Sequence, residues 1–509
     1  MPDTFAHING HRLRYRLQGE GPLAIFGHGL MGSIDALGLD SLMATELSSA
    51  IEKELRVTIA RSRIVVGASV DSLTEIITEK LKATDDFAAE TASSLPQLEA
   101  ARGSDSLTDA PIDFHDVAED VPQIHAVVTE QQQRKLKIDG RWIFDFASCN
   151  YLGLDLHSDV MAAVLPAIQK WGVHPSWTRA VASPEIYETL ESDLAAFLKA
   201  PSTLVFPSVT LLHAGVLPVL AGYDGVILRD ISAHRSIYEA CVQAQAQGAE
   251  VIEFKHNDVA DLAAKLSRYP FDRTKVIAID GVYSMSGLYP PLPAFAELAR
   301  RHGALIYLDD AHGVGVIGER PTAAMPYGHY GNGVVNHYGL DYVKDRMVYV
   351  AGLSKSFSSY GAFVVCHDEA MKQRLRRAST FIFSGPSPVA SLASAIAGLQ
   401  VNQREGEAFR STLYKLVRQL VDGAKTLGFE VVNENYFPIV GVVIGTTPDV
   451  VTACKILWEY GILITPALFP IVPIGRGLLR FSITAANTEE EIARSLEALA
   501  AVRDRCGLP

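Results

Sequence analysis

One lysine, Lys355, follows an apolar stretch from Met347 to Leu353 and stands between Ser354 and Ser356. The stretch predicts a buried β-strand, and a lysine at the end of such a strand can lose its water and stay partly neutral. A neutral amine forms imines, and an imine is the bond by which a lysine holds pyridoxal phosphate (PLP). Alone, a Ser-Lys-Ser triplet is more typical of a solvated loop, so the interpretation needs support from other residues.

An acid stands at the end of a second apolar stretch, where Leu305 to Leu308 leads into Asp309, Asp310 and His312. A carboxylate at a buried strand end can keep a pyridine nitrogen protonated, which makes the ring an electron sink. Two acids and a histidine also suit a metal ion, but no second group of ligands follows at a suitable spacing. The pattern therefore favours the organic cofactor over a metal.

Short apolar strands alternate with amphipathic helices in the chain around these residues. Strands that are apolar throughout predict an α/β fold with a largely parallel sheet covered on both faces, which collects ligands at the carboxyl ends of its strands. Beyond residue 400 the pattern changes, and segments 439–444 and 478–483 between helices predict a small α+β domain. The strands expected in the large sheet are 204–206, 225–228, 251–254, 276–279, 305–308, 347–350 and 362–365.

Several separate motifs, in this order, resemble the α-oxoamine synthases, a family of PLP enzymes of fold type I. They include Asn-Tyr-Leu-Gly-Leu at 150–154, Asp-Gly-Val-Tyr-Ser-Met at 280–285, Asp-Asp-Ala-His at 309–312 and Leu-Ser-Lys-Ser at 353–356. The resemblance runs from about residue 144 to residue 499. It implies a decarboxylative Claisen condensation of an amino acid with an acyl thioester, on acyl-carrier protein or acyl-CoA, that gives an α-amino ketone.

The resemblance also implies a role for each matching residue. Lys355 would bind PLP and act as a base, His234 would stack on the ring, and Asp309 would bind the ring nitrogen. The remaining matches are His312 and Ser284 near the phenolic oxygen, and Arg480, with Asn150, at the substrate carboxylate. At positions that depart from the family pattern, Ser208 and Thr210 are candidates for the phosphate, with Ser354 or Ser356 in place of the usual threonine.

The chain departs from the family pattern at several of these places. Gly352 stands where threonine usually precedes the lysine by three residues, and Ser208-Val209-Thr210 replaces serine, glycine and an aromatic residue. Other departures, at Tyr187, Ser286 and Asn487, concern the surroundings of the substrate, so the amino acid and the acyl chain remain open. Two alternatives also remain open: another fold type I reaction, such as transamination or aldol cleavage, and a catalytically degenerate fusion.

The N-terminal part has a different character. Residues 1–33 resemble the opening of an α/β-hydrolase, without the nucleophile motif that should follow. Residues 34–82 resemble a helical acyl-carrier module, in which Ser41 of Asp-Ser-Leu would carry 4'-phosphopantetheine. Residues 83–122 are acidic and aperiodic and predict a linker. The PLP-dependent large domain is expected over 123–400 and the small domain over 401–509.

Charge and composition limit the possible partners. A net charge of −13 over 509 residues argues against nucleic acid and anionic membranes, which attract basic surfaces. The N-terminus has no signal-peptide pattern, no apolar run is long enough to span a bilayer, and five scattered cysteines suggest neither disulfides nor zinc. We expect a cytoplasmic protein without a metal site. The similarity of Phe381-Ile382-Phe383-Ser384 to a family segment at the subunit interface predicts a homodimer.

Overall fold

The computed structural model describes residues 4–8, 11–17, 24–25, 120–468, 471–473 and 475–507. The chain divides into two compact units, one of residues 1–108 with 246–248 and the other of residues 109–245 and 249–509. In the first, the described strands β1 (Thr4–Ile8), β2 (His11–Leu17) and β3 (Ala24–Ile25) form an antiparallel sheet. The predicted carrier module, Ser41 and nearly all of the linker lie outside the described residues.

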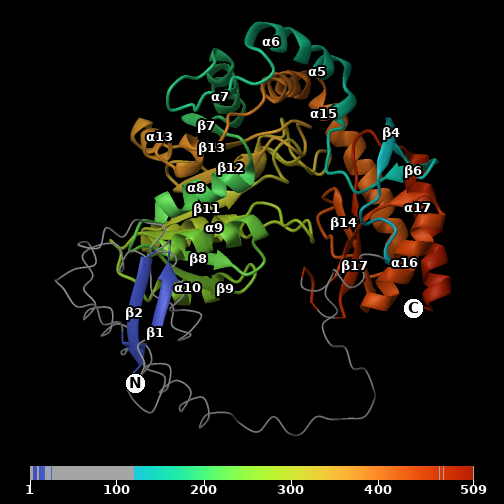
Figure 1. Ribbon diagram of the computed structural model, residues 1–509. Coiled ribbons are helices and arrows are strands. Elements are labelled where there is room, and N and C mark those ends of the chain that lie inside the picture. The colour runs from blue at the N-terminus through green and yellow to red at the C-terminus, as the bar shows by residue number, and fades with distance from the viewer. Residues whose placement is uncertain are drawn as a thin grey trace. The chain divides into compact units, whose positions relative to one another are not determined.

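A seven-stranded sheet forms the centre of the second unit (Figure 1). Its strand order is β7-β13-β12-β11-β10-β8-β9, and every neighbouring pair is parallel except the two pairs made by β13. The predicted largely parallel sheet is confirmed. The strands are β7 (Ser202–Phe206), β8 (Val226–Asp230), β9 (Glu250–Phe254), β10 (Lys275–Asp280), β11 (Leu305–Asp309), β12 (Met347–Gly352) and β13 (Ala362–Cys366).

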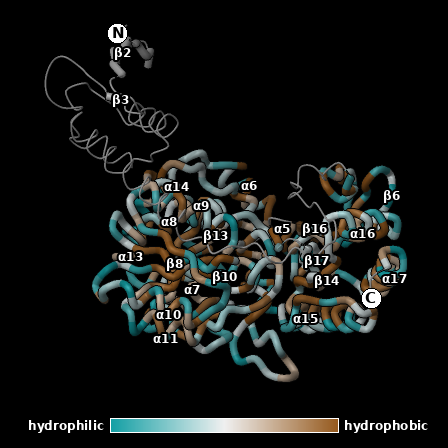
Figure 2. Tube along the Cα trace, turned by 90° about the horizontal axis from the view of Figure 1, so that it is seen from below, coloured by the Kyte–Doolittle hydropathy of each residue, from teal (hydrophilic) through white to brown (hydrophobic). Residues whose placement is uncertain are grey.

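Helices cover both faces of this sheet because alternate strand residues point to opposite sides. Val276 and Ala278 pack with α8 (Val209–Ala221), α9 (Arg235–Ala246), α13 (Glu369–Leu375) and α14 (Ser379–Ile382). Ile277 and Ile279 belong to the other apolar cluster, with α7 (Glu185–Leu198), α10 (Val259–Leu266), α11 (Leu292–His302), α12 (Gly333–His337) and α15 (Val389–Thr426). Figure 2 shows hydrophobic residues running through the body around β8, β10 and α8.

The C-terminal part contains a small antiparallel sheet, in the order β14-β17-β16, made by β14 (Ile439–Gly445), β16 (Thr465–Ala467) and β17 (Gly477–Ser482). Helices α16 (Thr447–Glu459) and α17 (Glu489–Cys506) pack beside it (Figure 1). A second small sheet joins β15 (Ile462–Leu463) to β4 (Val128–Gln132), β5 (Lys135–Ile138) and β6 (Arg141–Asp145). The chain between β6 and α7 carries η3 (Leu154–Leu156), α5 (Ser158–Ala162) and α6 (Val164–Trp171).

Candidate active site

A cavity of about 210 Å³ lies at the edge of the large sheet where β10, β11 and β12 end. This is the edge at which parallel α/β sheets place their ligands. Seven residues predicted from the sequence line this cavity: Ser208, Thr210, His234, Asp309, His312, Ser354 and Lys355. Its remaining lining residues are Val209, Ser236, Asp280, Val282, Ala311, Tyr360 and Gly361.

Lys355 reaches the cavity from a turn just after β12. Leu353 and Phe357 on either side of it are buried, and the Phe357 ring packs edge-on against Phe197 with 5.8 Å between the ring centroids. The Lys355 carbonyl accepts the Ser358 amide at 3.0 Å. These anchors hold the backbone of the turn, so that the half-buried lysine side chain can face the cavity.

The two consecutive acids at the end of β11 have different environments. Asp309 lines the cavity; its Oδ1 accepts the Ala311 amide at 3.0 Å and its Oδ2 faces His213 Nε2 at 2.9 Å. Burial opposes its charge, but His213, Lys355 and His234 outweigh burial and lower the Asp309 pKa to about 2. Asp309 therefore carries a negative charge at neutral pH.

Asp310 is turned away from the cavity. Its Oδ2 accepts the Tyr349 hydroxyl at 2.8 Å and the Val334 amide at 2.9 Å, which ties β12 and α12 to the end of β11. Burial raises the Asp310 pKa to about 7. The structure thus separates a cavity carboxylate from a structural one, as the order of acids in the motif implied.

Both predicted histidines face the cavity in an environment that favours the neutral ring. Burial lowers the pKa of His234, whose Nδ1 lies 2.7 Å from Ser236 Oγ and whose amide donates to Asp280 at 3.1 Å. Burial, with the charges of Lys355 and Arg480, holds the His312 pKa well below its usual range. His312 Nδ1 lies 2.7 Å from the hydroxyl of the buried Tyr151.

The first turn of α8 forms the end of the cavity suited to a phosphate. Ser208 caps the helix by accepting the Leu211 amide at 3.3 Å, and Thr210 lies in the first turn. The helix has 13 residues, and its N-terminus supplies unpaired amides and positive potential that favour an anion. With an amine, an anionic acid and neutral histidines in the same cavity, these groups fit PLP.

The residues predicted for the substrate carboxylate are not among those that line this cavity. Arg480, in β17, is 8% exposed, and its Nη2 contacts Cys149 Sγ at 3.3 Å, while its Nε has no hydrogen-bond partner. Asn150 is half-buried, and its backbone amide donates to Ser148 Oγ at 3.4 Å. The guanidinium thus contacts the residue before Asn150. Ser284 is half-buried beyond the end of β10 and also outside the lining.

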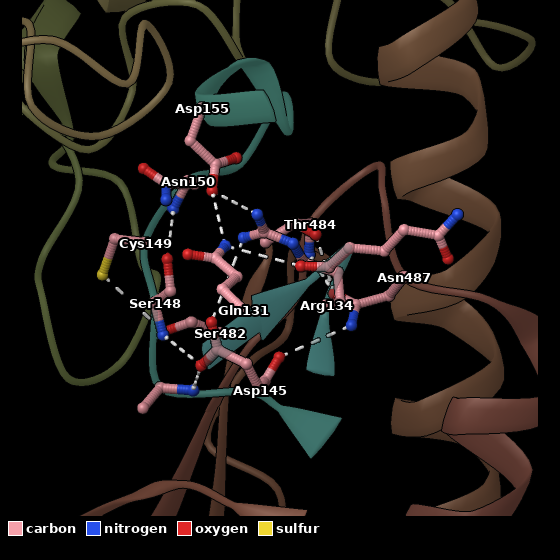
Figure 3. Close-up of polar contacts among 12 residues, drawn as sticks. Gln131, Arg134, Asp145, Ser148, Cys149, Asn150, Asp155, Ser482, Thr484 and Asn487 are labelled. Carbon is pink, nitrogen blue, oxygen red and sulfur yellow. Dashed lines mark hydrogen bonds and ion pairs between the residues drawn. The ribbon is translucent and has the colours of Figure 1, made fainter. Parts of the chain in front are cut away.

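A polar network holds the segment that carries Cys149 and Asn150 (Figure 3). Asp145 Oδ1 accepts the amides of Ala147 and Ser148, both at 3.0 Å. Arg134 pairs with Asp155, and Asn487 accepts the Thr484 amide at 2.8 Å while donating to Glu491 at 3.0 Å. Asn487, one of the departures from the family pattern, therefore has a structural role at this place.

Sequence reasoning gave no role to several residues of the site. Asp280, Ser236 and Tyr360 line the cavity, and Asp280 pairs in register with Asp309 across β10 and β11. The strand-end position of Asp280 was a signal that could have identified it, whereas the contact of His213 with Asp309 depends on how α8 packs. No group of three or more potential metal ligands occurs in the described part of the chain.

Two protein families match this chain. Residues 142–499 match the family described as aminotransferase class I and II, and residues 32–77 match the family described as phosphopantetheine attachment site. The second match covers residues 34–77 of the carrier module predicted over 34–82, and it supports the identification of that module.

The relatives agree with the family matches. The chain is 32% identical over 377 residues to 8-amino-7-oxononanoate synthase of Nitrosococcus oceani, covering 74% of this chain and 96% of the relative. The same enzyme of Dechloromonas aromatica is 33% identical, with coverage of 72% and 91%. Serine palmitoyltransferase of S. paucimobilis, solved with a bound PLP–myriocin aldimine, superposes with a TM-score of 0.70 at 28% identity, covering 75% of this chain and 93% of that one. Sphingomonas wittichii serine palmitoyltransferase gives 0.71 at 25%, covering 84% and 99%.

The fold and the cavity define a PLP-dependent enzyme of fold type I. The chain belongs to the aminotransferase class I and II family and, within it, to the α-oxoamine synthases, which are acyltransferases. Among the described residues, no helix is long and apolar enough to cross a membrane.

Proposed function

We propose that this chain condenses an amino acid with an acyl thioester, with loss of the amino acid carboxylate as carbon dioxide, and that its own carrier module presents the acyl group. The observation that carries the proposal is the cavity in which Lys355, Asp309 and His234 meet the first turn of α8. The match of residues 32–77 to the phosphopantetheine attachment family supports the second part.

Three residues act directly on the cofactor in this proposal. When bound, PLP withdraws electrons from the α-carbon of the amino acid and makes that carbon a nucleophile. Asp309, which is ionised, binds the protonated ring nitrogen, and His234 covers one face of the ring. The Lys355 amine holds the cofactor and, once released by the substrate amine, accepts the proton of the α-carbon.

The remaining residues bind and orient. Ser208, Thr210 and Ser354 hydrogen-bond the phosphate together with the first amides of α8. His312 offers Nε2 to the phenolic oxygen, because its Nδ1 is occupied by Tyr151, and Ser284 supplies a second hydrogen bond nearby. Arg480, buried without a carboxylate partner among its described hydrogen bonds, binds the carboxylate of the amino acid, with Asn150 beside it.

We propose Ser41 as the phosphopantetheine attachment residue, since it is the serine of the Asp-Ser-Leu motif within the matched carrier family. A thioester tethered to the same chain has a high effective concentration at the cavity compared with a free donor. The acyl carbon–sulfur bond breaks as the bond to the α-carbon forms, and the thiol stays on the carrier. We propose that residues 123–400 form the large domain and residues 401–509 the small domain of the catalytic part. A linker within residues 83–122 would allow the carrier to reach that part.

The proposal also includes a homodimer in the cytoplasm. Val173, Trp177, Val181 and Phe383 are exposed apolar side chains, with Phe383 85% exposed, on two segments joined by a hydrogen bond from Thr178 Oγ1 to the Ile382 carbonyl at 2.6 Å. Such a surface is typical of an interface. All five cysteines are free, in keeping with a reducing compartment. Phe383→Asp is expected to shift the mass measured by light scattering from dimer to monomer.

The experiment loads an acyl-phosphopantetheine group onto the purified chain with a phosphopantetheinyl transferase and acyl-CoA. The loaded chain is mixed with glycine, alanine and serine in turn, and the product is identified by mass spectrometry after one turnover. The control is Ser41→Ala with the same acyl-CoA free in solution. We expect an amino ketone with one amino acid, and at least about 100-fold less product from the control at low acyl-CoA.

Other outcomes would count against parts of the proposal. Equal product from Ser41→Ala would show that free acyl-CoA is the donor and that the carrier is dispensable. Consumption of the amino acid without loss of the thioester would identify another fold type I reaction. A chain that binds no PLP, with an absorbance spectrum identical to that of Lys355→Ala, would indicate a degenerate fusion.

A further inference from the structure

A buried histidine outside the predicted site, His213, contacts the carboxylate at the centre of the cavity. His213 lies on α8, one turn beyond Ser208 and Thr210, and is fully buried. Its Nε2 is 2.9 Å from Asp309 Oδ2 and its Nδ1 is 2.7 Å from the hydroxyl of Tyr307. Tyr307 lies on β11, two residues before Asp309. Tyr307, His213 and Asp309 therefore form a hydrogen-bonded chain between β11 and α8.

Hydrogen-bond chemistry fixes the direction of this chain. An ionised carboxylate only accepts, so His213 Nε2 carries the hydrogen and donates it to Asp309. Burial holds the Tyr307 pKa well above its usual value, and the phenol keeps its proton. The hydroxyl can therefore donate to Nδ1 of His213, an arrangement in which Nε2 is the nitrogen that carries the hydrogen toward Asp309. Tyr307 thus selects the tautomer that supports Asp309.

A second carboxyl, that of Asp280, lies beside Asp309, and its pKa is shifted in the opposite direction. Asp280 is the register partner of Asp309 on β10, and both side chains line the cavity. Burial and the adjacent Asp309 charge raise the Asp280 pKa well above its usual value, although the His234 amide donates to its Oδ1. Two neighbouring buried carboxyls therefore differ in charge, and His213 contacts only one of them.

We propose that His213, oriented by Tyr307, is the positioning residue that makes Asp309, rather than its neighbour Asp280, the anionic partner of the cofactor ring nitrogen. Without the His213 donor, the Ala311 amide is the hydrogen-bond donor that remains to Asp309 among the described contacts. The carboxyls of Asp309 and Asp280 can then compete for one proton. The other charged or titratable groups that act on the pair are His234 and Lys355 at the cavity, Asp310 beside Asp309, and Asp230, whose charge also raises the Asp280 pKa. The inference rests on the proposed role of Asp309.

The test uses the full chain freed of PLP and titrated with the cofactor, with absorbance following both the dissociation constant and the pH dependence of the visible band. His213→Leu removes the donor, and His213→Gln keeps an amide N–H near the position of Nε2. We expect His213→Leu to bind PLP about 10- to 100-fold more weakly and to shift the pH profile, and His213→Gln to stay within about 3-fold of wild type. Tyr307→Phe is expected to weaken binding about 3- to 10-fold.

The matched control is Leu217→Ala, a buried residue one turn further along α8 that does not line the cavity. It should lower stability without changing the dissociation constant or the pH profile. Wild-type values for folded His213→Leu, or equal weakening by Leu217→Ala, would overturn the inference. If His213→Leu does not fold, Tyr307→Phe decides, and unchanged values there would overturn it. Failure of the wild-type chain to bind PLP would instead remove the proposed function.

Discussion

Gly352 lies so close to Val209 that a β-carbon on the glycine would stand 2.7 Å from Val209 Cγ2. Gly352 ends β12, three residues before Lys355, and Val209 begins α8. Both positions depart from the family pattern of threonine before the lysine and glycine in the phosphate turn. The contact relates the two departures, because the valine fills the space that a side chain at position 352 would need.

This relationship predicts a coupled pair of substitutions. Gly352→Ala should lower the free energy of unfolding by about 1–3 kcal/mol, since the added methyl group overlaps the valine. Val209→Ala removes Cγ2, so the double variant should recover most of that loss. Urea unfolding of the wild type, both single variants and the double variant measures the coupling. Additive losses would show that the two positions do not share this space.

Cys149 is expected to be the most reactive thiol of the chain. Burial works against its ionisation, but the charges of Arg480 and Lys355 lower the Cys149 pKa, and the residue is half-buried. Burial raises the pKa of the other cysteines, to about 12 for Cys241, Cys366 and Cys454. Iodoacetamide near neutral pH should therefore label Cys149 first, as measured by peptide mass spectrometry.

Arg480→Gln should slow that labelling severalfold, because the thiolate loses the nearest positive charge. Cys149→Ser provides the blank for the labelled peptide. A carboxylate bound by Arg480 would also compete with the reagent, so the substrate amino acid should protect Cys149. Preferential labelling of Cys506, which is also half-buried, would contradict the electrostatic explanation.

The sequence predicted the sheet and much of the cavity because those features depend on local pattern. Uniformly apolar strands with polar residues at their carboxyl ends predict both the parallel sheet and the place of Asp309 and Lys355. The contacts of His213 and Cys149 depend on packing between segments far apart in the chain. His213 meets Asp309 across 96 residues and Arg480 meets Cys149 across 331, and no local periodicity carries such information.

Arg179 has a role that depends on contacts between separate segments of the chain. It donates to Glu191 Oε1 at 2.8 Å and to the Val205 carbonyl at 2.9 Å, and its guanidinium lies 3.9 Å from the Tyr187 ring centroid. Arg179→Met leaves a buried carboxylate with the Lys372 ammonium at 3.3 Å, and should cost about 3 kcal/mol of unfolding free energy.

The control for Arg179 is the exposed pair of Arg235 and Glu239, where Arg235→Met should cost less than about 1 kcal/mol. Adding Glu191→Gln to Arg179→Met should restore part of the loss, since it removes the charge that lost its partner. Chemical denaturation of the wild type and these three variants gives these differences. Equal costs at the buried and exposed pairs would mean that burial does not strengthen the Arg179 interaction.

Asp310 should make stability depend on pH in a defined direction. Burial raises the Asp310 pKa to about 7 in the folded chain, whereas the usual value for an aspartate is near 4. Between pH ~4 and pH ~7, the folded state therefore keeps a proton that the unfolded state has released. The stability contributed by Asp310 is therefore fully present at low pH and is lost as pH rises toward about 7, by a few kcal/mol in all.

Asp310→Asn tests this pH dependence, because the asparagine keeps an acceptor for Tyr349 and Val334 and cannot ionise. The difference in unfolding free energy between Asp310→Asn and wild type should grow in favour of the variant from pH ~4 to pH ~7 and then level off. A difference that is constant with pH, measured by urea unfolding at each value, would show that Asp310 is already ionised in the folded chain.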